Sequence, residues 1–251
     1  MYEQQHISVI IPVLDEESAI GIVVNELNAL KNPDGERLID DIIVCDNGST
    51  DNSSGVAHTA GARVTYQPER GYGAACLLGI ECLLDTDIVL FVDGDHSCVP
   101  EQAIGLIEEI HQGAALAIGS RSLGKEQAGS LTLPQKFGNK LSTLLIQMLW
   151  RQKVTDLGPF RAIKLSALKA LKMEDRRFGW TVEMQVKAIQ LKMNVVEIPV
   201  DSLKRIGKSK ISGTVSGVIG AGLGILGMIA KLWWREHCKT DEIYQKALNK
   251  A

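Results

Sequence analysis

The stretch Asp87–Pro100, which reads DIVLFVDGDHSCVP, limits the possible architectures of this chain more than any other. Within it the continuous apolar run Ile88–Val92 ends abruptly at Asp93 and Asp95, with one glycine between them. A short apolar run bounded by turn residues predicts a strand that is buried on both faces of a sheet. Ligands of open α/β sheets bind just beyond the carboxyl ends of such strands.

The two carboxylates after this strand have two interpretations. Burying them unpaired is costly, so a divalent cation such as Mg²⁺ or Mn²⁺, itself bound to phosphate oxygens, would neutralise them. Gly94 would then let the backbone approach a ligand closely. The alternative is a solvated turn, because Asp and Gly are both favoured in turns. This stretch alone does not separate the two.

Other apolar runs end in the same manner, and helical segments separate them. This alternation predicts βαβ units and an α/β fold with a mostly parallel central sheet flanked by helices. The predicted strands are Ile7–Leu14, Ile39–Cys45, Arg63–Tyr66, Ile88–Val92, Ala114–Gly119 and Asn194–Val200. Since the carboxyl ends of parallel strands share one edge, we predict a polar pocket there, formed by Glu16, Asp46, Asn47, Asp93 and Asp95.

Composition narrows the class of protein. The 251 residues are 45% hydrophobic and 23% charged, which is typical of a globular chain, and the net charge of −3 argues against nucleic acid as a partner. The five cysteines show no C-x-x-C spacing and are expected to be reduced thiols of a cytosolic protein. The polar start, Met1–His6, predicts no signal peptide, so the catalytic part is expected on the cytoplasmic side.

The segment Ile211–Ala230 has no charged residue, is rich in glycine, and is followed by the basic and aromatic stretch Lys231–Arg235. Its length would suffice to span a bilayer, but its glycines and hydroxyl residues make it only weakly hydrophobic. Three interpretations remain open: contact with or re-entry into a membrane surface, a packing or dimer helix, and a true span. The repeats Gly213-x-x-x-Gly217 and Gly220-x-x-x-Gly224 would allow close helix packing.

Two segments of the chain are therefore predicted, a catalytic domain over residues 1–210 and a glycine-rich apolar helix with a charged tail over residues 211–251. The end of this tail, Glu236–Ala251, is expected to fray.

Five short motifs occur in order along the chain, and together they resemble family 2 glycosyltransferases of the GT-A fold. The similarity is greatest to dolichyl- or polyprenyl-phosphate sugar transferases, and it extends from about Ile7 to Ala221. The motifs are Ile11-Pro12-Val13-Leu14-Asp15-Glu16-Glu17, Asp46-Asn47-Gly48-Ser49-Thr50-Asp51, Asp93-Gly94-Asp95, Gly119-Ser120-Arg121 and Arg205-Ile206-Gly207-Lys208-Ser209-Lys210.

This resemblance implies roles for individual residues. The nucleoside pocket would be lined by Pro12, Leu14, Glu16, Cys45 and Asn47, with Asp46 beside them. The ribose and an Mg²⁺ or Mn²⁺ ion would be bound by Asp93, Gly94 and Asp95, with Ser97 as a further metal ligand. The diphosphate or acceptor phosphate would be faced by Arg121, Arg205 and Lys210. Arginine suits phosphate oxygens because it can bind two at once.

The resemblance also implies a reaction, the inverting transfer of a hexose from a UDP- or GDP-sugar to a polyprenyl or dolichyl phosphate at the cytoplasmic face of a membrane. A lipid phosphate is already an anion, whereas a hydroxyl acceptor would need a general base. Asp156 is the candidate carboxylate for the acceptor side, with a helix cap or turn cap as its alternative. We therefore expect Asp95, Asp156 and Arg121 to be the catalytic residues.

Two departures from the family pattern affect base recognition, namely Asn47 in place of an Asp and Leu14 in place of a Tyr. Other functions stay open: a hydroxyl acceptor, a nucleotidyltransferase, or a non-catalytic membrane-tethered scaffold. A nucleotidyltransferase would carry a glycine-rich, Lys-bearing loop after the first strand, which Pro12–Glu17 is not. His96 could be a metal ligand, and Glu183 a carboxylate at a helix start. The sugar, the base, the acceptor and any homo-oligomer are not determined by these residues.

Overall fold

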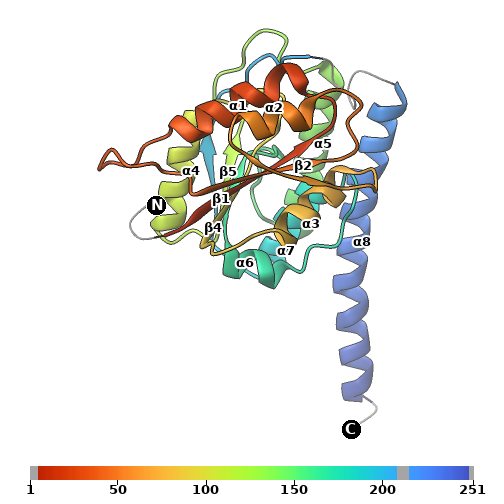
Figure 1. The fold of residues 1–251 in the computed structure, drawn as a ribbon. Helices are drawn as coiled ribbons and strands as arrows, with labels where there is room; N and C mark the ends of the chain where they lie inside the picture. The colour runs from red at the N-terminus through yellow and green to blue at the C-terminus, as the bar shows by residue number, and fades with distance from the viewer. Residues whose placement is uncertain (1–4, 208–214, 249–251) are drawn as a thin grey trace.

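The computed structural model describes residues 5–207 and 215–248 of the chain. Its centre is a seven-stranded sheet, which lies between helices in Figure 1. The strands are β1 (Ile7–Val13), β2 (Asp41–Asp46), β3 (Arg63–Tyr66), β4 (Ile88–Phe91), β5 (Leu116–Ser120), β6 (Arg161–Lys164) and β7 (Val195–Pro199). Their order across the sheet is β3-β2-β1-β4-β6-β5-β7.

The sheet is mostly parallel, as predicted. Among the described strands β6 alone runs against its neighbours, pairing antiparallel with both β4 and β5. The carboxyl ends of β1, β2, β4, β5 and β7 therefore lie at the same edge. Because β6 starts where those strands end, the segment that precedes it also reaches this edge.

Helices cover both faces of the sheet. The α-helices are α1 (Glu17–Ala29), α2 (Ser53–Thr59), α3 (Tyr72–Glu81), α4 (Ala103–His111), α5 (Leu133–Trp150), α6 (Leu165–Leu171), α7 (Trp180–Gln190) and α8 (Val215–Leu248), and the short 3-10 helix η1 (Pro100–Gln102) leads into α4. Apolar side chains of α1, α2 and α4 pack on one face, and those of α3, α6 and α7 pack on the other. This double cover explains the continuous apolar runs, since every residue of β4 is buried.

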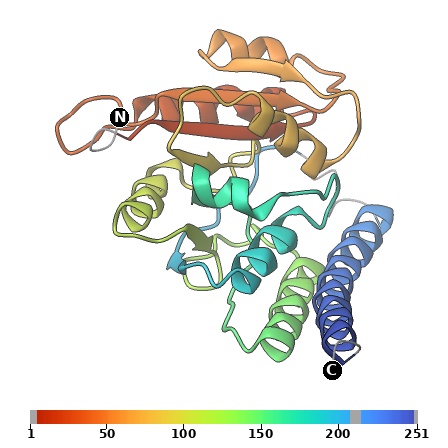
Figure 2. The same cartoon turned by 90° about the horizontal axis from the view of Figure 1, so that it is seen from below.

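A third apolar cluster joins α5, α7 and α8, and includes Ile146, Val182 and Met228. In Figure 2 α5 (green) and α8 (blue) lie side by side at the edge of the molecule. Gly213 of the first glycine repeat lies outside the described residues. In the second repeat, a Cβ at Gly224 would lie 3.2 Å from the Cβ of Phe178 in the loop before α7, so close helix packing through these repeats stays a prediction.

The C-terminal segment differs in one respect from expectation. The predicted fraying from Glu236 is wrong as far as Leu248, because α8 continues to that residue and projects past the rest of the chain (Figure 1). No glycine or proline interrupts the sequence there, and Glu236 accepts hydrogen bonds from the indole of Trp150 and the amide of Gln190. Within the described residues, no helix combines the length and apolar character that crossing a bilayer requires. The division of the chain at residue 210 stays a prediction.

Candidate active site

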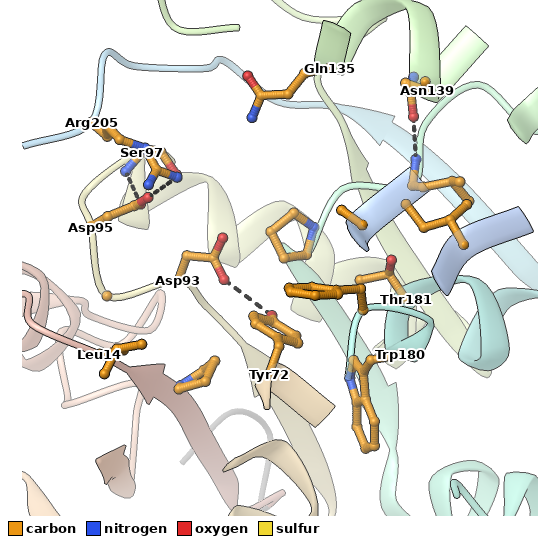
Figure 3. Close-up of a pocket in the computed structure, with 18 of the residues that line it drawn as sticks. Leu14, Tyr72, Asp93, Asp95, Ser97, Gln135, Asn139, Trp180, Thr181 and Arg205 are labelled. Carbon is orange, nitrogen blue, oxygen red and sulfur yellow. Dashed lines mark hydrogen bonds and ion pairs between the residues drawn. The ribbon is translucent and has the colours of Figure 1, made fainter. Parts of the chain in front are cut away.

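A cavity of about 580 Å³ lies at the shared carboxyl edge of the sheet. Loops after β1, β2, β4, β5 and β7 form one side of it, and residues of α5, α7 and α8 form the other. Figure 3 shows side chains from both sides pointing toward the space between them. Among the residues predicted for the site, those that line the cavity are Pro12, Leu14, Glu16, Asn47, Asp93, Gly94, Asp95, Ser97, Arg121 and Arg205.

The carboxylates that follow β4 have different partners. Asp93 is partly buried and accepts a hydrogen bond of 3.1 Å from the hydroxyl of Tyr72 (Figure 3). Asp95 is 3% exposed; its Oδ1 accepts from the backbone N–H of Ser97 at 3.0 Å, and its Oδ2 lies 2.5 Å from Nη2 of Arg205. Burial, followed by the charge of Asp95, raises the pKa of Asp93 to about 7. Two carboxylates held together in this way favour a cationic partner.

Gly94 is required by packing. A Cβ at this position would lie 2.8 Å from Cγ2 of Val13, too close for two non-bonded carbon atoms. The turn between the two carboxylates is thus pressed against the end of β1, which brings both strand ends to the same wall of the cavity.

Arg121 and Asp156 form a buried ion pair on the other side of the cavity. Asp156 is 1% exposed, and both its oxygens accept from the guanidinium of Arg121, at 2.8 and 2.7 Å. Its Oδ2 also accepts from the backbone N–H of Arg121 at 2.7 Å. Burial alone would raise the pKa of Asp156, but the hydrogen bonds and charge of Arg121 outweigh it and hold that pKa below its usual range. This geometry suits Asp156 to orienting Arg121.

The segment that carries Asp156 is itself held in place from two sides. Glu197 of β7 accepts from the backbone N–H of Thr155 at 3.0 Å and from its hydroxyl at 2.9 Å. Asn139 of α5 donates to the carbonyl of Thr155 and accepts from the N–H of Leu157 at 3.0 Å. Sequence reasoning did not find Glu197 or Asn139, because nothing in the local pattern of β7 or α5 indicates contact with a segment so distant along the chain.

Arg205 reaches Asp95 because the loop after β7 runs beside the turn after β4. The N–H of Ile206 donates to the carbonyl of Asp95, and the N–H of Leu203 to that of Ser97, both at 2.9 Å. Lys210, predicted to face the phosphates, lies outside the described residues.

Asn47 lines the cavity and organises its rim. Its Nδ2 donates to the carbonyls of Gln67 and Glu69, at 3.1 and 2.6 Å, and its Oδ1 accepts from the N–H of Gly71 at 2.7 Å. Both amide hydrogens are therefore engaged, and the second lone pair of Oδ1 is the part of the side chain left for a ligand.

Two of the residues predicted for the nucleoside side do not line the cavity. Cys45 is fully buried in the core between β2 and α3, where burial raises its pKa to about 12. Asp46 is turned away toward α2, since it accepts from the N–H of Ser49 at 2.7 Å and from the hydroxyl of Ser54. The prediction that Asp46 helps to form the pocket is thus wrong, because Ser49 and Ser54, which follow β2, donate hydrogen bonds to its two carboxylate oxygens.

The two further candidates also have other partners. His96 lies 2.8 Å from Oε2 of Glu26, away from the cavity lining. Glu183 is buried in the first turn of α7, where it pairs with Lys187 at 2.8 Å and accepts from the N–H of Asp175 at 2.7 Å. It anchors the loop before α7.

Several cavity residues were missed by sequence reasoning. For some of them the sequence does hold a signal, because Arg70-Gly71-Tyr72-Gly73 is a glycine-containing turn at the start of α3, a common arrangement for ligand contact. Those on α5 and α7 carry no such pattern. The missed residues include Arg70, Tyr72, Gln135, Asn139, Arg177, Trp180 and Thr181.

The family model described as Glycosyl transferase family 2 matches residues 8–172 of the chain. The chain belongs to glycosyl transferase family 2. An uncharacterized glycosyltransferase of Mycobacterium tuberculosis is 32% identical over 216 residues, which cover 85% of this chain and 93% of that protein. This family 2 protein is therefore an enzyme, a glycosyltransferase, as the motifs predicted.

Two relatives with more specific names are less similar to this chain. An undecaprenyl-phosphate mannosyltransferase of Micrococcus luteus is 27% identical over 190 residues, covering 70% of this chain and 78% of its own. A dolichyl-phosphate hexose transferase of Haloferax volcanii is 25% identical over 219 residues, covering 86% and 91%.

Among solved structures, glucosyl-3-phosphoglycerate synthase from Mycobacterium tuberculosis, in complex with Mn²⁺, UDP and phosphoglyceric acid, superposes with a TM-score of 0.73. The match covers 92% of this chain and 79% of that one, at 20% identity. At this identity the likeness establishes the fold, and the predicted GT-A fold is confirmed.

Proposed function

We propose that this glycosyltransferase moves a hexose, with inversion, from a UDP- or GDP-sugar to a polyprenyl phosphate in the presence of Mg²⁺ or Mn²⁺. One observation carries the proposal: Asp93 and Asp95 face the same cavity as Arg121 and Arg205, and the opposite wall is formed by α5 and α8. The names of the Micrococcus luteus and Haloferax volcanii relatives support a lipid phosphate as the acceptor.

The residues present fit a divalent metal that is shared with a phosphate ligand. Within the described part of the chain, no group of three or more His, Cys, Asp or Glu side chains could hold a metal. Mg²⁺, however, is usually bound by one or two carboxylates together with water and substrate phosphates. Asp93 and Asp95 would be these carboxylates, with Ser97 beside them. When bound, the metal supplies positive charge to the departing nucleoside diphosphate.

The arginines complete the charge balance of the site. Arg121 keeps its charge and its direction because Asp156 holds two of its nitrogens. Arg205 neutralises Asp95 in this structure, and its planar guanidinium can equally bind a pair of phosphate oxygens. Both cations line the cavity where a diphosphate leaving group would be stabilised.

The acceptor side favours a group that is already ionised. A hydroxyl acceptor would need a general base, and both oxygens of Asp156, the predicted candidate, accept hydrogen bonds from Arg121. A phosphate acceptor needs no such base. The wall opposite the carboxylates carries polar side chains such as Gln135, Asn139 and Thr181, but it also offers apolar surface that suits a lipid. The apolar residues are Leu131, Pro134, Phe178, Ala221 and Ile225.

The test is a transfer assay with a panel of UDP- and GDP-sugars, Mn²⁺, and either a short polyprenyl phosphate or phosphoglyceric acid as acceptor. We expect label to move into the organic phase with one donor, to stop with EDTA and to return with added Mn²⁺. Asp95→Ala should lower the rate roughly a hundredfold, whereas Asp41→Ala, at an exposed ion pair, should not. Transfer to phosphoglyceric acid alone, or an unchanged rate in Asp95→Ala, would contradict the proposal.

A lipid acceptor would also require the protein to work at a membrane surface. We propose that it works at the cytoplasmic face of a membrane as a peripheral protein.

A further inference from the structure

Helix α5 carries a row of exposed apolar side chains along its outer side. Leu133, Phe137, Leu144 and Met148 follow one another at intervals of four, seven and four residues, so they lie on one face of the helix. Their exposure ranges from 52% at Leu144 to 81% at Leu133. The opposite side of α5 is the buried one, with Ser142, Thr143 and Ile146. Exposed apolar residues in a row, unlike scattered ones, indicate a contact surface.

Helix α8 repeats this arrangement. Ile219, Leu223, Leu226 and Trp234 are exposed, and their spacing of four, three and eight residues again places them on one face. Met228, Ile229 and Leu232 of the same helix are buried against α5 and α7. Because α5 and α8 lie side by side at the edge of the molecule (Figure 2), we treat their eight exposed apolar residues together as a two-helix face.

The charges on and beside the two-helix face are mostly basic. Helix α5 contains no acidic residue, and the first acidic residue of α8 is Glu236. Lys136 and Arg235 are paired with Glu126 and Glu174 of neighbouring segments. Exposed basic residues on or directly after the helices are Lys140, Arg151, Lys153 and Lys231. An apolar helix face bordered by lysine and arginine is complementary to an anionic lipid surface.

The two-helix face is also continuous with the cavity. Pro134 and Gly138 of α5 and Ala221 and Gly222 of α8 line the cavity between the same two helices. A Cβ at Gly138 or at Gly222 would meet no atom within 4 Å, so the wall is open at both positions. The helices that carry the two-helix face thus also line the cavity that contains the carboxylates and arginines.

We infer that the two-helix face docks onto the surface of an anionic lipid bilayer, with α5 and α8 lying along the headgroup layer. The purpose of this docking, the delivery of an acceptor lipid between the two helices, rests on the proposed function. The docking itself can be measured without any substrate.

The experiment is vesicle flotation of the full chain, with phosphatidylcholine vesicles that contain or lack phosphatidylglycerol. The test variants are Phe137→Glu and Leu223→Glu, with Met148→Glu as a second change on α5 should the first not fold. The matched controls are Tyr66→Glu and Leu84→Glu, whose side chains are 64% and 69% exposed, against 70% for Phe137 and 69% for Leu223, but lie on β3 and after α3. Circular dichroism of each variant should match that of the wild type, which checks that the variant is folded.

The wild-type chain should bind the anionic vesicles, and added salt should weaken this binding. Each test variant should bind roughly tenfold more weakly, and the controls should bind like the wild type. Absence of wild-type binding, or equal loss in test and control variants, would overturn the inference. So would a dimer in sedimentation that Leu223→Glu dissociates, because the occupant of the face would then be a second copy. Vesicle binding without sugar transfer would refute the proposed function and leave the docking intact.

Discussion

Replacing Asp156 by Asn tests whether the buried ion pair organises the acceptor side of the site. The change keeps the shape of the side chain but removes its charge and turns an NH₂ group toward the donors of Arg121. Three hydrogen bonds to Arg121 depend on this carboxylate, two from the guanidinium and one from the backbone N–H. In Asp156→Asn the guanidinium of Arg121 would remain as a cation without a carboxylate beside it.

The loss of stability expected for Asp156→Asn follows from the burial of the ion pair. Removing one partner of a buried ion pair costs about 3–5 kcal/mol. The Arg121 side chain is 25% exposed and can regain some water, which places the expected loss near the lower limit, about 3 kcal/mol of the free energy of unfolding. The matched control is Asp41→Asn, because Asp41 forms a similar pair with Arg63 at 2.6 Å but with the arginine 45% exposed. An exposed pair of this kind contributes about 1 kcal/mol or less.

The assay is equilibrium unfolding in urea, followed by circular dichroism, for the wild type and both variants. The Asp156→Asn midpoint should fall well below that of Asp41→Asn, with an unchanged slope against urea concentration. If the two variants lost equal stability, burial would not distinguish the two pairs and the reasoning would fail. An Asp156→Asn variant as stable as the wild type would be equally decisive against it.

Three other outcomes are expected. Gly73→Ala should lower the melting temperature by roughly 5 °C, because the added Cβ would overlap a carbonyl oxygen of the loop before α7. Gly227→Ala should raise the melting temperature through helix propensity, because its Cβ would meet no atom within 4 Å. A thermal melt in which Gly227→Ala is the less stable variant would contradict this. Because the pKa of Asp156 is lower in the folded state, the stabilisation that its carboxylate contributes is complete above about pH 4 and is lost as the pH falls through its pKa in the folded protein. The difference in unfolding free energy between the wild type and Asp156→Asn should therefore shrink in acid. A difference that grows in acid would refute the assignment. Burial raises the pKa of Cys45 to about 12, so iodoacetamide at pH 8 should leave this thiol unmodified in the native protein. Mass spectrometry measures the modification, and modification before unfolding would place Cys45 at the surface instead.

The layered sheet and the edge at which its site lies could be predicted from local pattern. Runs such as Ile88–Val92 are continuously apolar, which requires cover on both faces, and helical segments between them impose parallel strands. From these features alone the carboxylates after β4 belong at the edge of the sheet, close to the loop after β1. Both features depend on neighbours in the sequence, and such dependence is visible without a structure.

Contacts between distant segments could not be obtained in this way. Asp46 and Asp93 look equivalent in the sequence, because both are acidic residues at the ends of buried apolar runs. In the structure Asp46 accepts hydrogen bonds from the segment after β2, whereas Asp93 faces the cavity. The pairing of Arg121 with Asp156 depends on β6 being inserted between β4 and β5, an order that no local periodicity encodes. The two-helix face likewise exists only because α5 and α8 pack on α7. Hydrophobic periodicity indicates which side of a helix or strand is buried, but the segment that packs on that side depends on the tertiary packing of the whole chain.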